Sequence, residues 1–148
     1  GADATTIHPY MGYDSLSPFF NFKNKYNFVL ALTSNPGAVD FEKQVLNGRP
    51  LYSKVIEACS SWNKSHNNIG IVVGATQDEL QSIRKLDPEM LFLIPGVGQQ
   101  GGSYEIALQN GVNRDGLALI NIGRSIIYAN STPQFAEYIR KAILSQVN

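Results

Sequence analysis

Five short apolar or β-branched segments recur along the chain, and each is closed by a loop rich in glycine, proline or small polar residues. The segments are Ala4–Ile7, Phe28–Leu32, Ile69–Val73, Met90–Ile94 and Leu117–Ile122. Segments that do not alternate apolar with polar residues are typical of parallel strands buried on both faces. The pattern therefore predicts a parallel sheet of the α/β class.

Amphipathic helices are predicted between these strands, because three segments carry an apolar stripe at helical spacing. The stripes are Leu51, Val55, Cys59 and Trp62, then Leu80, Ile83 and Leu86, and finally Phe135, Ile139, Ile143 and Val147. Thr76 with Glu79 predicts a capping box before the second stripe, and Thr132-Pro133 predicts the start of the third helix. We interpret all three stripes as core.

Strand–helix repetition allows an open doubly wound sheet or a (β/α)8 barrel. A complete barrel needs about 250 residues, whereas this chain has 148, which suits a single domain over residues 1–148. The first predicted strand also begins almost at Gly1, as if the chain were cut into. We therefore expect either an open sheet or a partial barrel covering about strands 4 to 8. Spacing alone leaves both open.

Charge and composition exclude several classes of function. The 12 basic and 12 acidic residues balance, so nucleic-acid binding and a polybasic membrane patch are not expected. The lone Cys59 cannot form an internal disulfide, and no metal site is expected from the spacing of His8 and His66. No apolar run approaches the roughly 20 residues of a membrane span, and no signal peptide opens the chain. A cytoplasmic protein is the prediction.

The loop Pro95–Ser103 is the strongest candidate for a binding site. It holds four glycines directly after a predicted strand, and such a loop can turn backbone N–H groups toward an anion. Ser103 is expected to cap the following helix, whose N-terminus favours negative charge. The alternative is a flexible turn, but the glycine content favours an anion site. The loop matches neither a Walker nor a Rossmann pattern.

Gly123 and Arg124 follow the next predicted strand, where an arginine can donate two N–H groups to a phosphate. Taken alone, Arg124 is better explained as a surface residue paired with a carboxylate. Two such loops on consecutive strands favour phosphate, because barrels often build a phosphate site after strands 7 and 8. Pro95–Ser103 and Arg124 would then form one site.

The loop Thr33–Gly37 offers hydroxyl and amide groups that could contact a polar ring, although a turn before proline is favoured from this loop alone. His8 also follows a predicted strand, but it is as easily a packing residue as a catalytic one. No nucleophile, base and orienting residue can be assembled. The sequence indicates phosphate-ester binding without the means to transform the ligand.

Read together, four motifs resemble those of the orotidine 5'-phosphate decarboxylase family, in its longer bacterial and eukaryotic-like subgroup. Their order and their placement at strand ends agree across nearly the whole chain. They are Gly1–Gly12, Thr33–Ala38, Pro95–Gly102 and Asn121–Ile126. The resemblance implies a TIM barrel, a cytoplasmic enzyme of pyrimidine synthesis, and the conversion of orotidine 5'-phosphate to UMP and CO2 without metal or cofactor.

The resemblance also implies roles for individual residues. Ser34 would contact the pyrimidine, and Gln100 would reach from a closing loop to the phosphate and toward Ser34. Gly123 and Arg124 would hold the phosphate, with Pro95 as a wall of the site. These contacts would contribute to rate as well as affinity, since binding energy can drive loop closure.

The family's catalytic lysine and aspartate residues have no counterpart in this chain, and we expect them upstream of Gly1. The chain alone is therefore not expected to decarboxylate. We expect a homodimer, or association with the missing first half through exposed strand edges. Two alternatives stay open: another sugar-phosphate barrel enzyme of the epimerase or hexulose-phosphate synthase type, and a non-catalytic phosphate-binding module.

Overall fold

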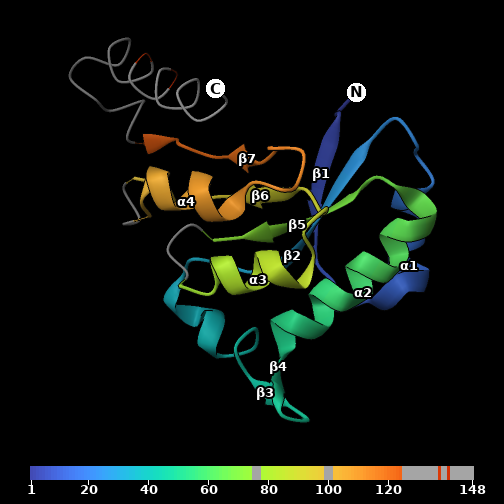
Figure 1. Ribbon diagram of the computed structural model, residues 1–148. Coiled ribbons are helices and arrows are strands. Elements are labelled where there is room, and N and C mark those ends of the chain that lie inside the picture. The colour runs from blue at the N-terminus through green and yellow to red at the C-terminus, as the bar shows by residue number, and fades with distance from the viewer. Residues whose placement is uncertain (75–77, 99–101, 125–136, 138–139, 141–148) are drawn as a thin grey trace.

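Five strands form one parallel sheet in the order β1-β2-β5-β6-β7. They are Ala4–Ile7 (β1), Tyr26–Leu32 (β2), Ile69–Val73 (β5), Phe92–Ile94 (β6) and Leu119–Ile120 (β7). The computed structural model describes residues 1–74, 78–98, 102–124, 137 and 140 (Figure 1). Each successive parallel strand joins the same side of the sheet, which is the winding of a barrel, whereas a doubly wound sheet reverses its order. The predicted partial barrel is confirmed over the open sheet.

Four helices follow β1, β2, β5 and β6 in turn. They are Gly12–Phe20 (α1), Leu51–His66 (α2), Leu80–Leu86 (α3) and Tyr104–Gly111 (α4). Between β2 and α2 the chain makes a 3-10 turn, Pro36–Val39 (η1), and a small hairpin of Val45–Leu46 (β3) and Arg49–Pro50 (β4). The hairpin projects away from the sheet (Figure 1). Its turn is Asn47-Gly48, both with positive φ (54° and 77°), and such a pair is a known hairpin signal that the sequence analysis missed.

The core lies between the sheet and the helices that cover it. Every residue of β5 is buried, as expected for a strand with neighbours on both sides and both faces covered. β1, which pairs only with β2 among the described strands, exposes Ala4, Thr5 and Thr6. None of the described helices is long and apolar enough to cross a membrane.

The helix stripes were predicted in part. In α2, Cys59 is buried and Val55 and Trp62 pack against the core, but the fully buried Ile56 was missed. In α3, Leu80 and Ile83 are buried as predicted.

Leu86 contradicts its predicted core position. It is the last residue of α3 and is 48% exposed. Glu79, placed in a capping box, is the N-cap residue of α3 and its side chain makes no capping bond. Thr76, Thr132-Pro133 and the third stripe lie outside the described residues.

Polar side chains tie the chain together at the N-terminal ends of the strands. The amide nitrogen of Asn68, just before β5, lies within hydrogen-bond distance of the carbonyls of Phe20, Phe22 and Lys25, at 3.1, 3.1 and 3.0 Å. Asn68 is 3% exposed, so these carbonyls supply the partners that its buried amide N–H groups cannot obtain from water. This end of the sheet is therefore fixed by side-chain-to-backbone bonds.

Candidate functional site

Ser34 links two of the loops singled out by the sequence. Its hydroxyl donates to the carbonyl oxygen of Pro95 at 3.4 Å. Ser34 follows β2 and Pro95 follows β6, and β5 lies between these strands in the sheet. The loop after β2 therefore reaches across the end of β5 to meet the glycine-rich loop.

This crossing depends on Gly74, the residue that follows β5. The Gly74 N–H donates to the carbonyl of Leu32 at 2.8 Å, which holds it beside the end of β2. A Cβ at position 74 would lie 2.7 Å from the nitrogen of Ser34 and 3.0 Å from its Cα. Only a residue without a side chain leaves room for Ser34 there.

Glu42 holds the same loop from the other side. Its carboxylate accepts the backbone N–H of Thr33 at 2.7 Å, and the Thr33 hydroxyl lies 2.9 and 3.0 Å from its two oxygens. The Thr33 hydroxyl is also 2.6 Å from Oδ1 of Asn35. Bonds from backbone N–H to a carboxylate are charge-assisted and stronger than neutral ones. The carboxylate thus fixes the backbone immediately before Ser34.

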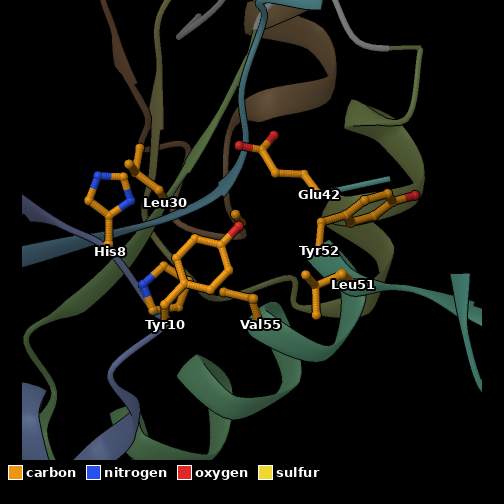
Figure 2. A pocket seen from close by; sticks show the side chains of 9 residues that line it. His8, Tyr10, Leu30, Glu42, Leu51, Tyr52 and Val55 are labelled. Carbon is orange, nitrogen blue, oxygen red and sulfur yellow. The ribbon is translucent and has the colours of Figure 1, made fainter. Parts of the chain in front are cut away.

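A pocket lies beside the Glu42–Thr33 contact (Figure 2). Its lining residues are His8, Pro9, Tyr10, Leu30, Ala31, Glu42, Leu51, Tyr52 and Val55. His8 stacks on Tyr10 with ring centroids 6.5 Å apart and planes 18° apart. In Figure 2 the Glu42 carboxylate points toward the ribbon at the end of β2, in keeping with its bonds to Thr33. His8 has an aromatic neighbour but no carboxylate partner among the described residues.

The glycine-rich loop is closed on itself by backbone bonds. Gly96 and Gly98 have positive φ (96° and 86°), a conformation that glycine adopts freely. The Gly98 N–H donates to the carbonyl of Gly102 at 2.9 Å, and the Gly102 N–H donates to the carbonyl of Gly96 at 3.2 Å. These two N–H groups are therefore not free for an anion, unlike the simple cradle that glycine content suggested. Gln100 lies outside the described residues.

Ser103 caps α4 as predicted. Its hydroxyl oxygen accepts the N–H of Ile106 at 3.2 Å, and the same hydroxyl donates to Glu105 at 2.8 Å. Bonds from its own backbone and from Ser103 hold the pKa of the Glu105 carboxyl below its usual range. The helix start after the glycine-rich loop thus has a side-chain cap and a carboxylate in its first turn.

Gly123 and Arg124 follow β7 and are both exposed. The loop begins beside the glycine-rich one, since β7 pairs with β6 and the Asn121 N–H donates to the Ile94 carbonyl at 3.0 Å. No carboxylate within residues 1–74, 78–98 and 102–124 forms an ion pair with Arg124, so the surface-pair interpretation gains no support there. Three of the five described strands, β2, β6 and β7, thus end in loops with candidate binding groups.

The strand-end residues suit binding better than bond breaking. Ser34 offers a hydroxyl, Pro95 a carbonyl and Arg124 a guanidinium. None of these groups is a general base at neutral pH. Among the described residues no group of three or more His, Cys, Asp or Glu side chains could hold a metal ion. Tyr52, in the pocket, has a pKa raised by burial and by the charge of Glu79, with Lys43 opposing.

Glu42 and Gly74 were missed by the sequence analysis. Gly74 stands directly after a predicted strand, so its position at a strand end could be read from the sequence. The need for a glycine there, beside Ser34, could not. Glu42 lies nine residues beyond Thr33 in a segment with no recognised pattern. Only the folded loop shows that these two residues meet Ser34 and its neighbour.

The sequence model of the family described as "Orotidine 5'-phosphate decarboxylase / HUMPS family" matches residues 1–139. An orotidine 5'-phosphate decarboxylase of Christiangramia forsetii is 49% identical over 138 residues, covering 93% of this chain and 50% of that protein. One of Halobacterium salinarum is 47% identical over 130 residues, covering 86% of this chain and 49% of that protein. The chain spans about half the length of the curated relatives it matches.

Solved structures agree with these matches. The structure of Leishmania donovani UMP synthase superposes with a TM-score of 0.90 at 40% identity, covering 97% of this chain and 33% of that one. The structure of Leishmania donovani OMP decarboxylase superposes with a TM-score of 0.88 at 37% identity, covering 97% of this chain and 57% of that one.

Proposed function

The chain belongs to the orotidine 5'-phosphate decarboxylase / HUMPS family, and from that premise we propose that it carries the pyrimidine- and phosphate-binding loops of an orotidine 5'-phosphate decarboxylase. The supporting observation is the contact of Ser34 with Pro95 at 3.4 Å across Gly74. It joins a loop assigned to the base with a loop assigned to the phosphate. A nucleotide has both groups, whereas a sugar phosphate has only one.

Each proposed contact has a physical basis. Ser34 offers a hydroxyl that can both donate to and accept from a pyrimidine edge. Arg124 and the Gly123 N–H would hold the phosphate, which a guanidinium can bind through two parallel bonds. Pro95 would form a wall, and Gln100 would reach the phosphate from the glycine-rich loop. Neither metal nor cofactor enters the proposal.

We propose that the reaction is decarboxylation of orotidine 5'-phosphate to UMP, with its catalytic residues supplied from outside residues 1–148. No lysine stands directly after any of the five described strands, so no proton donor of that kind stands at these strand ends. The exposed residues of β1 mark an edge of the sheet where another strand could pair. That strand would come from a second copy of this chain or from the other half of the barrel. We place this single-domain chain in the cytoplasm.

The binding half of the proposal is tested by calorimetric titration of the chain with UMP. Arg124→Ala should weaken UMP binding roughly 10- to 100-fold, since a charge-assisted bidentate contact is lost. Arg114→Ala is the matched control, because Arg114 is also exposed but pairs with Glu89 at 2.7 Å. UMP affinity equal to that of ribose 5-phosphate would instead support a sugar-phosphate enzyme, and phosphate binding alone a non-catalytic module.

The catalytic half is tested by complementation. The chain would be mixed with the part of the Christiangramia forsetii decarboxylase that lies outside the matched 138 residues. Release of CO2 from orotidine 5'-phosphate by the mixture, and by neither part alone, is the expected result. Release by the chain alone would overturn the assignment of the catalytic residues, and none from a stably associated mixture would overturn the proposed reaction.

A further inference from the structure

We propose that Glu42 and Gly74 are positioning residues that set the place of the Ser34 hydroxyl, and so decide whether the site distinguishes a pyrimidine nucleotide from a bare sugar phosphate. The inference rests on the proposed function, in which Ser34 contacts the pyrimidine. Neither residue is proposed to touch the ligand. Each acts through the backbone at or beside Ser34.

Glu42 is suited to this role because the backbone that carries its carboxylate is itself held by hydrogen bonds. The Glu42 carbonyl accepts the N–H of Tyr52 at 2.9 Å, at the start of α2. The next residue, Lys43, donates its N–H to the Ala38 carbonyl at 3.0 Å and pairs with Glu79 at 2.9 Å. A carboxylate on such a support can hold the Thr33 backbone in one place at a modest loss of conformational entropy.

Glu42 controls the backbone of Thr33 rather than its side chain alone. One carboxylate oxygen lies 2.7 Å from the Thr33 nitrogen and 3.0 Å from its hydroxyl oxygen. Removing the carboxylate leaves a half-buried N–H without its acceptor, and the loop must move or admit water to satisfy it. Because Ser34 is the next residue, its hydroxyl would move with that backbone.

Gly74 limits the position of Ser34 through close contact with its backbone. Its φ lies outside the left-handed region, so alanine would not strain the backbone at position 74 itself. The added Cβ would instead meet the Ser34 nitrogen at 2.7 Å, closer than real Cβ contacts allow. Alanine at position 74 should therefore displace Ser34 and its hydroxyl from the 3.4 Å contact with Pro95.

The test compares two ligands, UMP and ribose 5-phosphate, by titration of the whole 148-residue chain. Ser34→Ala, Glu42→Ala and Gly74→Ala should each weaken UMP binding roughly 3- to 10-fold, the loss of one hydrogen bond. Ribose 5-phosphate, which has no base, should bind within about twofold of wild type in all three. Glu42→Gln keeps one acceptor oxygen and should restore part of the preference.

Two controls separate positioning from general loss of stability. Gly70→Ala alters β5, the strand that Gly74 follows, since a Cβ there would lie 2.5 Å from the Leu91 carbonyl and 2.8 Å from the Phe28 ring. It should lower the melting temperature while leaving the UMP to ribose 5-phosphate preference unchanged. Glu89→Ala removes an exposed carboxylate that has no contact with Thr33 or Ser34. It should change neither the melting temperature nor the preference for UMP.

The possible failures are distinguishable. A wild-type chain without any preference for UMP would overturn the proposed function and this inference with it. A wild-type preference that Ser34→Ala abolishes but Glu42→Ala and Gly74→Ala retain would overturn the inference alone. A shift in preference in Gly70→Ala as large as that in Gly74→Ala would also overturn it.

Discussion

The guanidinium carbon of Arg84 lies 3.4 Å from the centroid of the Phe92 ring. From this position the side chain donates to the carbonyls of Asp87 at 2.9 Å and Met90 at 2.7 Å, and to that of Gly111 at 2.5 Å. One residue thereby joins α3, the start of β6 and the end of α4. Burial lowers the pKa of Arg84 to about 10, with Asp87 and Glu89 opposing, so the side chain is still charged at neutral pH.

Replacing Arg84 with methionine should destabilise the fold by about 2–4 kcal/mol, because three carbonyls lose their donor. Lysine should restore only part of this, since one ammonium cannot match the planar fork. Urea unfolding provides the measurement, with Arg114→Met, at an exposed position, as the control. An Arg84→Met chain as stable as its control would show that the carbonyls find other donors.

The Cys59 thiol should be inert in the folded chain. It is fully buried, and burial raises its pKa to about 12. The folded state therefore keeps a proton that the unfolded state releases near pH 9, so stability present below pH 9 is lost as the pH rises toward 12. We expect no reaction with a disulfide reagent at pH 8 without denaturant, and a weaker alkaline loss of stability in Cys59→Ala. Rapid labelling of the folded chain would contradict this.

Asn67 ends α2 in the left-handed conformation, with φ 57° and ψ 29°. Asn67→Ala should lower the free energy of unfolding by about 1 kcal/mol, because alanine lacks the short polar side chain that lets asparagine adopt this region at lower cost. Asn67→Gly should leave stability equal or higher, since glycine adopts positive φ freely. Thermal unfolding of both variants checks this, and equal effects of alanine and glycine would argue against conformation as the cause.

Ser103 allows stability and binding to be separated. Ser103→Ala should cost about 1 kcal/mol, since α4 loses its N-cap. Ser103→Asp keeps a capping oxygen and should retain stability, yet its added charge beside the proposed phosphate site should weaken UMP binding. Unfolding and titration of the two variants provide the data. Unchanged UMP affinity in Ser103→Asp would place the phosphate elsewhere.

The strands were largely predictable, because burial on both faces leaves an uninterrupted apolar run. Ile69–Val73 has the same bounds in sequence and structure. Met90 was wrongly placed in a strand, since its N–H donates to the Asp87 side chain and its carbonyl accepts from Arg84. Leu117 was misplaced for a similar reason, being bonded to Asn113 through both its N–H and its carbonyl. Polar side chains three to six residues before these positions thus bond the backbone that would otherwise extend each strand.

The site was predictable only as a set of loops. The loops that hold Ser34 and Pro95 could be singled out because strand-end loops of parallel sheets converge at one edge, whereas the two residues themselves were identified only through the family resemblance. Their direct contact could not, because it depends on how far the loop after β2 crosses the sheet. The importance of Glu42 and Gly74 arises from tertiary contacts alone, and neither residue type at its position indicates them.

Asn68 and Arg84 bond to backbone carbonyls that precede β2 and β6, respectively, at the end of the sheet opposite to Ser34 and Pro95. Backbone carbonyls are present whatever the side chain, so these anchors tolerate sequence change around them. Mutational drift in the loops beyond the strands can then alter ligand choice while the scaffold stays folded. A half-barrel arranged in this way can vary its binding loops at one end without unfolding, and random libraries at positions 33–35 and 95, with Gly96 and Gly98 kept because of their positive φ, should be rich in folded variants.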